Sequence, residues 1–398
     1  MKLVKGPEAE RVTGGLWRQF LISEIAGEIM LGEVQDHLYV EDLDFKGRSK
    51  DKVVRDSVET GFLDLIDDAT ERLSFYKKEL EPYSDITELL SEKELKRALF
   101  HMISGHTHCF SSSVITDNPY YQCIKIPTVE KDHILLTMND YLPGEFIQTY
   151  HDKQHSDNVF MHAEAGFFDD KVNFPVLLEN GEVWMSLVMS EIESMEEPLR
   201  LARGKVITYG LGLGYYAFMA AQKETVDSVT IVEMNPSIIK IFNDVLLPQF
   251  PHKEKIHIVQ ADAFDYADHQ ADGEYDIAFG DFWSGVEEGL EFYLKFLKKT
   301  ERIRKTRFDY WIESCFAEYY FRPVLMHFFM REIFGRDEAL WENQHRIKQI
   351  QKQFEKFLYD KEIELNSAKQ FEDIFKTPNV VQLVREFVMH YYRERGPR

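Results

Sequence analysis

Cysteine is scarce in this chain of 398 residues, which has only Cys109, Cys123 and Cys315. They are too few and too unevenly placed for the disulfide framework typical of small secreted domains. The N-terminal stretch MKLVKGPEAERVTGG carries charges throughout and lacks the apolar segment of a signal peptide. Together these features predict a cytoplasmic protein.

Long hydrophobic runs and an excess of positive charge are also missing. No uncharged apolar run reaches the roughly 20 residues that a bilayer-spanning helix needs, so we expect no membrane partner. Lys and Arg number 47 against 69 Asp and Glu, and the net charge is -22. Because nonspecific nucleic-acid binding depends on clustered basic residues, nucleic acid is not expected as a partner. A small molecule is the expected substrate.

A glycine-rich turn dominates what is present. The run Val206–Tyr209 is apolar and β-branched, which is typical of a strand buried on both faces. Gly210, Gly212 and Gly214 follow at every second position, and the helix-forming stretch YYAFMAA comes next. A loop without Cβ atoms lets a ligand lie against the backbone, and a helix N-terminus presents unpaired N–H groups. The stretch therefore predicts a site for a nucleotide-like or carboxylate-bearing ligand.

Acidic residues end the next three expected strands. SVTIVEM (228–234) delivers Glu233 before a helix that begins at Asn235-Pro236-Ser237, IHIVQAD delivers Asp262, and YDIAFGD delivers Asp281. In an open parallel sheet ligands bind at the carboxyl edge, so these side chains are expected to lie near one another. An acid at the end of the second strand is suited to accept the hydroxyls of a ribose.

The identity of the ligand depends on the glycine spacing. The dinucleotide fingerprint G-x-G-x-x-G would need a glycine at Tyr215. A side chain there hinders the close packing of helix and strand that the last glycine allows, so the pattern disfavours NAD or FAD.

The order and spacing of these features resemble those of class I S-adenosylmethionine-dependent methyltransferases. The preceding stretch LLENGEVWMSLVMSEIESMEEPL resembles, more narrowly, the spermidine synthase-like branch. The resemblance implies an α/β fold with a Rossmann-like, doubly wound parallel sheet and S-adenosylmethionine as the cofactor. It places the methionine part of the cofactor on the glycine loop, the ribose near Glu233 and Met234, and the adenine near Asp262 and Ala263.

The same resemblance indicates a catalytic base. Asp281 matches the first Asp of the D-S-x-D-P segment that assists deprotonation of the attacking amine in spermidine synthases, although it would alternatively serve as a loop cap. Phe282 and Trp283 are expected to form an aromatic wall beside the sulfonium or substrate. Ser284 and Gly285 replace the second Asp and the Pro. Since polyamines are held by carboxylates, methyl transfer to a small molecule is favoured, with aminopropyl transfer or a non-catalytic relative as alternatives.

The remaining periodicities predict four parts: a helical region at 1–115, an antiparallel β region with a lead-in helix at 116–200, the Rossmann-like domain at 201–335 and a helical extension at 336–398. Helices are expected at 16–30, 51–76, 85–102, 189–201 and 286–304. Strands are expected at 120–126, 133–138, 158–168 and 308–314, together with a hairpin around Asn180-Gly181.

Several polar clusters allow two interpretations. His101, His106, His108 and Cys109 match no familiar metal motif, so we expect no metal. His151, His155 and His162 are expected to be surface residues more often than substrate contacts. The acids Glu191, Glu193, Glu196 and Glu197 are interpreted as a solvated helix face, or alternatively as supplying one acid that reaches the cofactor.

The C-terminal segment departs from the methyltransferase pattern. After the strand expected at 308–314, helical sequence replaces the strand hairpin that would complete a seven-stranded sheet. Residues 316–334 are rich in aromatics, and we expect them to cover the core, with a homodimer interface as the alternative.

Overall fold

The computed structural model describes residues 1–29, 107–148, 165–168, 170–336 and 344–390. The chain forms two compact units. The sheet unit comprises Ser112–Tyr141, Lys171–Phe316 and Val388–Arg398, and the helical unit comprises Met1–Ser111, Leu142–Asp170 and Ala317–Phe387. The helical unit thus combines the N-terminal segment with residues 317–387, whereas the sequence predicted four consecutive parts.

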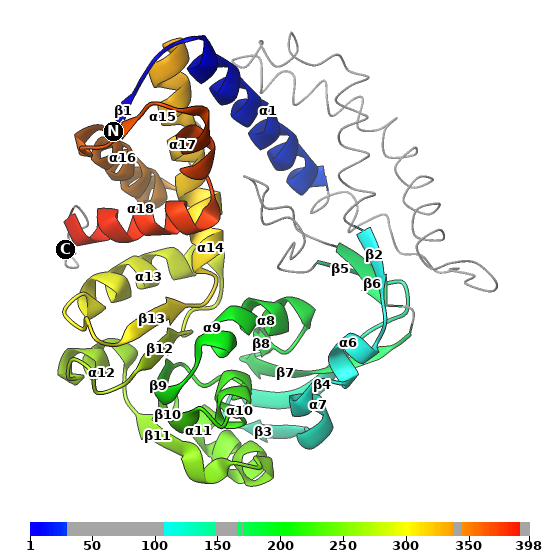
Figure 1. The fold of residues 1–398 in the computed structure, drawn as a ribbon. Coiled ribbons are helices and arrows are strands. Elements are labelled where there is room, and N and C mark those ends of the chain that lie inside the picture. The colour runs from blue at the N-terminus through cyan, green and yellow to red at the C-terminus, as the bar shows by residue number, and fades with distance from the viewer. Residues whose placement is uncertain (30–106, 149–164, 169, 337–343, 391–398) are drawn as a thin grey trace. The chain divides into compact units, whose positions relative to one another are not determined.

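The sheet unit is built on five parallel strands in the order β11-β10-β9-β12-β13 (Figure 1). The strands are β9 (Gly204–Tyr209), β10 (Val226–Glu233), β11 (Ile256–Gln260), β12 (Ile277–Gly280) and β13 (Arg307–Tyr310). The chain starts at the central strand, moves to one edge, and returns to continue on the other side. The predicted α/β fold with a doubly wound parallel sheet is therefore confirmed, and the strand order reverses between β9 and β12.

Helices connect these strands. They are α10 (Tyr215–Ala221), α11 (Pro236–Ile241) with a π-helical turn at Phe242–Leu246, α12 (Ala263–His269), α13 (Val286–Thr300) and α14 (Glu313–Phe316), and two short 3₁₀ turns cover Leu247–Gln249 and Lys253–Lys255. The predicted start of α11 is confirmed, because the Asn235 side chain accepts hydrogen bonds from the Ser237 and Ile238 amides and Pro236 occupies the first turn. Helix α13 begins at the predicted residue, Val286, and ends at Thr300, four residues before the predicted end of the range 286–304.

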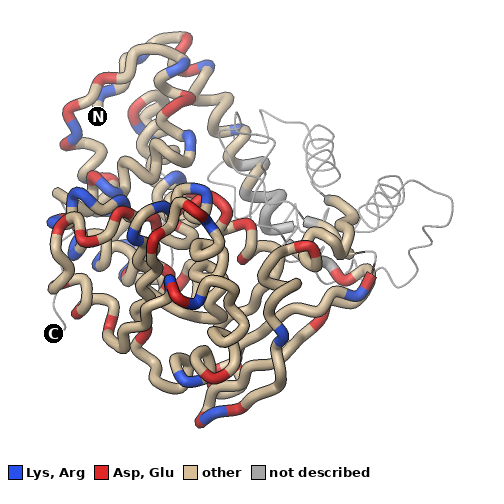
Figure 2. The backbone as a smooth tube through the Cα atoms, turned by 60° about the horizontal axis from the view of Figure 1, so that its bottom comes forward, with Lys and Arg blue, Asp and Glu red and all other residues tan. Residues whose placement is uncertain are grey.

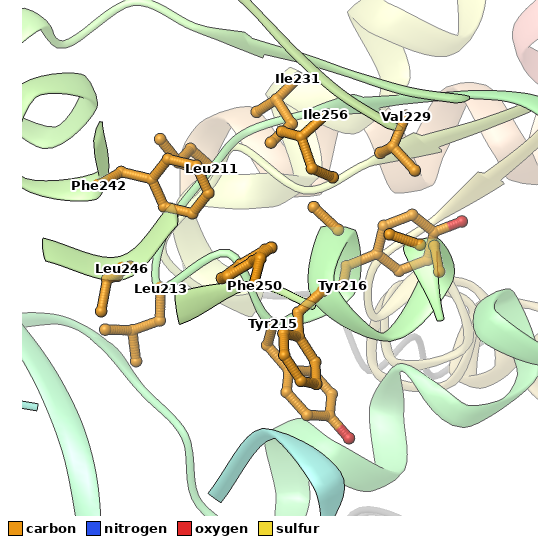
Figure 3. Packing of buried hydrophobic residues seen from close by; sticks show 14 of the residues in the cluster. Leu211, Leu213, Tyr215, Tyr216, Val229, Ile231, Phe242, Leu246, Phe250 and Ile256 are labelled. Carbon is orange, nitrogen blue, oxygen red and sulfur yellow. The ribbon is translucent and has the colours of Figure 1, made fainter. Parts of the chain in front are cut away.

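The core of the sheet unit holds the glycine loop in place. Figure 3 shows side chains of this loop and of α10 among residues of β10, β11 and the segment after α11. Leu213 is fully buried and Leu211 is 6% exposed. The apolar residues between the glycines thus anchor the loop in the core. The labelled residues are Leu211, Leu213, Tyr215, Tyr216, Val229, Ile231, Phe242, Leu246, Phe250 and Ile256.

A four-stranded antiparallel sheet precedes the parallel one in the chain. Its order is β3-β4-β7-β8, with β3 at Val129–Lys131, β4 at Ile134–Tyr141, β7 at Val172–Glu179 and β8 at Glu182–Ser186. The predicted hairpin is confirmed. Both turn residues have positive φ, 54° at Asn180 and 86° at Gly181, as a type I′ turn requires.

Two sequence predictions next to this sheet are wrong. Residues 120–126 do not form a strand, because Asn118 caps a helix, α7 (Pro119–Cys123), with Pro119 in its first turn; α6 (Ser113–Thr116) precedes it. The helix predicted at 189–201 is two helices, α8 (Met189–Ser194) and α9 (Glu196–Leu201), which meet at Met195. Pro198 has no N–H to continue α8, and it fits the first turn of a new helix.

The helical unit has its own framework. Strand β1 (Lys2–Leu3) pairs in parallel with β14 (Glu364–Leu365), and β2 (Thr107–Phe110), β6 (Ala165–Phe168) and β5 (Phe146–Gln148) form a second small sheet. The helices are α1 (Pro7–Ile29), α15 (Arg322–Phe334), preceded by a π-helical turn at Ala317–Phe321, α16 (His345–Asp360), α17 (Ala368–Asp373) and α18 (Thr377–His390). The helices predicted at 51–76 and 85–102 lie outside the described residues.

The aromatic segment 316–334 divides between the two units. Phe316 packs on Trp283 and Tyr293 beside the parallel sheet. The fully buried Phe321, Phe328 and Phe329 instead contact rings of the C-terminal helices, at Phe354, Tyr359 and Phe375. Phe316 thus meets the expectation that this segment covers the sheet core, whereas these three phenylalanines do not. In the described residues the parallel sheet ends at β13, and helices follow it, as predicted.

Charge and hydropathy agree with the composition. Figure 2 shows acidic and basic residues interspersed along the described chain. Among the helices of the described residues, none combines the length and the apolar character needed to cross a membrane. Cys109, Cys123 and Cys315 are not joined by disulfide bonds.

Candidate functional site

The glycine loop follows β9 and has a backbone that only glycine adopts readily. The φ angles of Gly210, Gly212 and Gly214 are 105°, 50° and 73°. A Cβ on Gly210 would lie 1.7 Å from the carbonyl oxygen of Asp281. The glycine therefore allows the end of β12 to approach the loop, and this approach brings the predicted base beside the predicted ligand loop.

A small pocket of about 10 Å³, room for about one water molecule, lies at this point. It lies where strand order reverses between β9 and β12, the position at which open α/β sheets bind ligands. Gly210 and Asp281 both line it, so the structure brings these two predicted site residues together. The lining residues are Met185, Met195, Thr208, Gly210, Leu211, Tyr215, Tyr216, Ala217, Ile231 and Asp281.

Glu233 ends β10 and is tied to the glycine loop. One carboxylate oxygen accepts a hydrogen bond from the Leu211 amide at 3.2 Å, and the other accepts from the Asn235 amide at 2.7 Å. Burial raises the pKa of this carboxyl, and the hydrogen bonds oppose that effect. Its position beside the loop fits a ribose contact, while its backbone bonds also brace the loop. Met234, next in the chain, is 65% exposed.

Asp262 forms the N-cap of α12. Its Oδ1 accepts hydrogen bonds from the amides of Phe264 at 2.8 Å and Asp265 at 3.0 Å. Ala263, the first residue of the helix, is buried. In the described part of the chain both of these bonds go to Oδ1, which leaves Oδ2 to accept from a ligand such as an adenine amino group.

Asp281 and Glu191 form a half-buried acidic pair. Burial raises the pKa of Asp281 to about 7. Burial, and then the neighbouring charge of Asp281, raise the pKa of Glu191 in α8 to about 8. Glu191 is half-buried and Glu193 is buried, whereas Glu196 and Glu197 are exposed. The interpretation of this acid run as a solvated face is therefore wrong for Glu193.

The residues after Asp281 anchor their segment in an aromatic cluster. Phe282 meets the rings of Phe264 and Phe296 edge-on, at 5.6 Å and 4.9 Å. Trp283 is 5% exposed and packs near Tyr293. Neither residue lines the cavity, so their contact with a substrate stays a prediction. Ser284, at the position of the missing second acid, is exposed and its hydroxyl donates to Glu288 at 2.6 Å.

Met185 is one of the lining residues that were not predicted from the sequence. Met185 in β8 places its sulfur over Gly212, where an added Cβ would lie only 2.1 Å from it. The Leu213 amide donates to the same sulfur at 3.2 Å. The strand pattern marked this residue as part of a hairpin, and only the three-dimensional structure shows that it reaches the glycine loop.

The histidine clusters contribute little to the site. His108 and Cys109 lie in β2, while His101, His106, His151, His155 and His162 are outside the described residues. Within the described ranges no group of three or more His, Cys, Asp or Glu side chains is arranged to hold a metal ion.

Comparisons with known proteins give a likeness of structure alone. The sequence matches no family model and no curated protein. Similar solved structures include the spermidine synthase from Thermotoga maritima, with 13% identity, a TM-score of 0.28, and coverage of 48% of this chain and 72% of that one. A spermidine synthase in complex with the transition state analogue AdoDATO has 12% identity, a TM-score of 0.28, and coverage of 42% and 64%. A probable spermidine synthase from Corynebacterium glutamicum ATCC 13032 has 14% identity, a TM-score of 0.28, and coverage of 44% and 59%, so this chain spans less than two thirds of the latter two proteins.

Proposed function

We propose that this protein is an S-adenosylmethionine-dependent methyltransferase that methylates an amine of a small molecule. The observation that carries the proposal is the position of Asp281, which lines the cavity beside the glycine loop and has a pKa raised to about 7 by burial. A carboxyl with this pKa is suited to accept a proton near neutral pH.

The binding site follows from the ends of the strands. The glycine loop, Glu233 and Asp262 would hold the methionine part, the ribose and the adenine, respectively. Their backbone and carboxylate groups fit these parts, because the loop glycines carry no Cβ atoms and Glu233 lies directly beside the loop. S-adenosylmethionine supplies an activated methyl group attached to a sulfonium.

The chain's own residues then act on the acceptor. Methyl transfer is an in-line displacement in which a nitrogen–carbon bond forms as the carbon–sulfur bond breaks, and the electron pair of the broken bond stays on sulfur. The apolar walls at Met195, Tyr215 and Ile231 exclude water from the cavity. Asp281 accepts the proton that the amine nitrogen loses, and Glu191 offers a second carboxyl near it.

Aminopropyl transfer from decarboxylated S-adenosylmethionine is the second candidate. It is favoured by the Glu191–Asp281 pair, because Glu191 would supply the carboxylate that Ser284 lacks. None of the residues that line the cavity is Lys or Arg, so this part of the described chain has no cationic side chain to pair with the carboxylate of an amino acid.

Isothermal titration separates the candidates. The full chain is titrated with S-adenosylmethionine, S-adenosylhomocysteine and decarboxylated S-adenosylmethionine, and the Glu233→Ala variant serves as the control for the site. Tighter binding of S-adenosylmethionine and S-adenosylhomocysteine, lost in the Glu233→Ala variant, supports methyl transfer. Tighter binding of decarboxylated S-adenosylmethionine supports aminopropyl transfer. No binding of any of the three would overturn both and leave a non-catalytic protein.

A turnover assay tests the base. With a panel of amines, we expect the rate to rise with pH through about 7 as Asp281 loses its proton. The Asp281→Asn variant should bind S-adenosylhomocysteine as the wild type does but lose about 10²- to 10⁴-fold in rate. An Asp281→Asn enzyme with the wild-type rate would contradict the role of Asp281.

A further inference from the structure

Met185 covers the face of the glycine loop. Its sulfur contacts Gly212 and accepts the hydrogen bond of the Leu213 amide at 3.2 Å. A thioether sulfur is a weak acceptor, so this amide has a poorer partner than an oxygen would be. A ligand that brings an oxygen to the loop therefore offers the Leu213 amide a stronger hydrogen bond than Met185 does.

An irregularity in β8 aims Met185 at the cavity. Leu177 pairs with Met185 and Leu178 pairs with Val183, so Trp184 is an extra residue in the ladder between β7 and β8. Bulges of this kind redirect side chains and are frequent beside active sites. Val183 is 59% exposed and Trp184 39% exposed, whereas Met185 is half-buried and lines the cavity.

We infer that Met185 is a specificity-determining residue of the adenosyl site, whose thioether must leave the glycine loop before the amino-acid part of a ligand binds there. This inference rests on the proposed function. Methionine is suited to the role, because its unbranched side chain has three rotatable bonds and moves at low cost. When it moves, the Leu213 amide exchanges its hydrogen bond to the sulfur for a hydrogen bond to the ligand.

The inference makes a distinction between two ligands. S-adenosylhomocysteine carries an amino-acid part that would reach the loop, whereas 5′-methylthioadenosine lacks that part and would leave Met185 in place. Removing the Met185 side chain should therefore tighten the binding of S-adenosylhomocysteine and leave the binding of 5′-methylthioadenosine unchanged. The ligand binds only those molecules in which the thioether has left the loop. The smaller the fraction of such molecules, the weaker the apparent affinity for the ligand.

The test combines titration with NMR on the full chain. With methionine methyl groups labelled with ¹³C, we expect the Met185 resonance to shift on saturation with S-adenosylhomocysteine but not with 5′-methylthioadenosine. In titrations, Met185→Ala should lower the Kd of S-adenosylhomocysteine by about threefold and leave that of 5′-methylthioadenosine unchanged. Met185→Leu, which keeps the volume but cannot accept a hydrogen bond, should give an intermediate value.

Met195→Leu is the matched control, since Met195 lines the same cavity and is fully buried. It should not tighten the binding of S-adenosylhomocysteine. The inference is overturned if the wild type binds this ligand without a shift of the Met185 resonance, or if Met185→Ala weakens both ligands equally; the proposed function survives both results. If neither ligand binds to the wild type or to Met185→Ala, the proposed function fails as well.

Discussion

Asp281 and Glu191 place a chemical requirement and a stability requirement in conflict. Both carboxyls are partly shielded from water in the folded chain, and their pKa values are raised to about 7 and about 8. Ionising them in the fold is unfavourable, yet a base must be ionised to accept a proton. Sites of this kind commonly lower stability in exchange for activity.

The sign of this effect follows from proton binding. Between the pKa that Asp281 has in the unfolded chain, about 3.9, and its folded value near 7, the folded state binds more protons. The free energy of unfolding therefore falls as pH rises through this window. At higher pH the loss is complete, and at pH below the unfolded pKa it is absent.

The neutral variant Asp281→Asn should escape this loss. We expect its stability advantage over the wild type to grow by about 2 kcal/mol between pH 5 and pH 8.5. Urea denaturation at both pH values measures it. Glu197→Gln is the control, because Arg200 lowers the pKa of the exposed Glu197 below both pH values and its effect should barely change. An equal advantage of Asp281→Asn at both pH values would contradict the burial of an ionisable Asp281.

The sequence predicted some of these residues and missed others for a physical reason. The three glycines, Glu233 and Asp281 occupy fixed places relative to strand ends, and local spacing is enough to locate them. Glu191 looked solvated because acids surround it in the chain, and its burial depends on how α8 packs. The position of Met185 at the cavity depends on one extra residue in the pairing of β7 with β8, and local sequence patterns do not predict such a bulge.

The start of α12 combines a structural role with the proposed binding role. Asp262 Oδ1 caps the helix, and Oδ2 is the oxygen that would meet the adenine. An asparagine keeps an oxygen for the cap but puts an amide NH₂ in the place of Oδ2.

Asp262→Asn should therefore separate the two roles. We expect it to keep the stability within about 0.5 kcal/mol of the wild type, since Asn caps as well as Asp, and to weaken S-adenosylhomocysteine binding. Asp262→Ala should lose the cap as well, at about 1 kcal/mol. Thermal denaturation and titration on both variants measure these effects. If Asp262→Asn binds as tightly as the wild type, Asp262 is only a cap.

Elements were predicted well where one signal dominated. The Asn180-Gly181 hairpin and the Asn235-Pro236 helix start have local turn and cap chemistry that fixes the backbone. At 120–126 two signals competed, since the β-prone residues indicated a strand while Asn118-Pro119 favoured a helix start. The cap and the proline determined the outcome for the first four residues of this segment, through Cys123.

The helical unit is held together by aromatic packing across distant parts of the chain. Phe329 is fully buried, and its ring lies 5.3 Å from that of Phe371 and 4.8 Å from that of Phe375. Phe334, in the same helix, is 40% exposed. The two residues therefore offer a matched test of this core.

Phe329→Ala should destabilise the protein by about 3–5 kcal/mol, because it leaves a cavity among these rings. Phe334→Ala should cost less than about 1 kcal/mol. Urea denaturation followed by circular dichroism measures both. Equal losses in the two variants would mean that the aromatic core does not hold the unit together.

The sequence predicted a helical C-terminal extension but not the residues that it joins. Helical periodicity shows which face of a helix is apolar, and it does not identify what covers that face. Here residues of the first and last parts of the chain share one unit, so the division into consecutive parts could not anticipate it.

The pairing of β1 with β14 has a consequence for the newborn chain. Lys2 and Leu3 find their partners only at Glu364 and Leu365. A ribosome adds about 5–20 residues per second, so the first strand waits roughly 20–70 s for its neighbour to be made. The five parallel strands, which are complete at Tyr310, are made during that wait. Lys2 and Leu3 are thus among the last residues to find their partners, although they are made long before them.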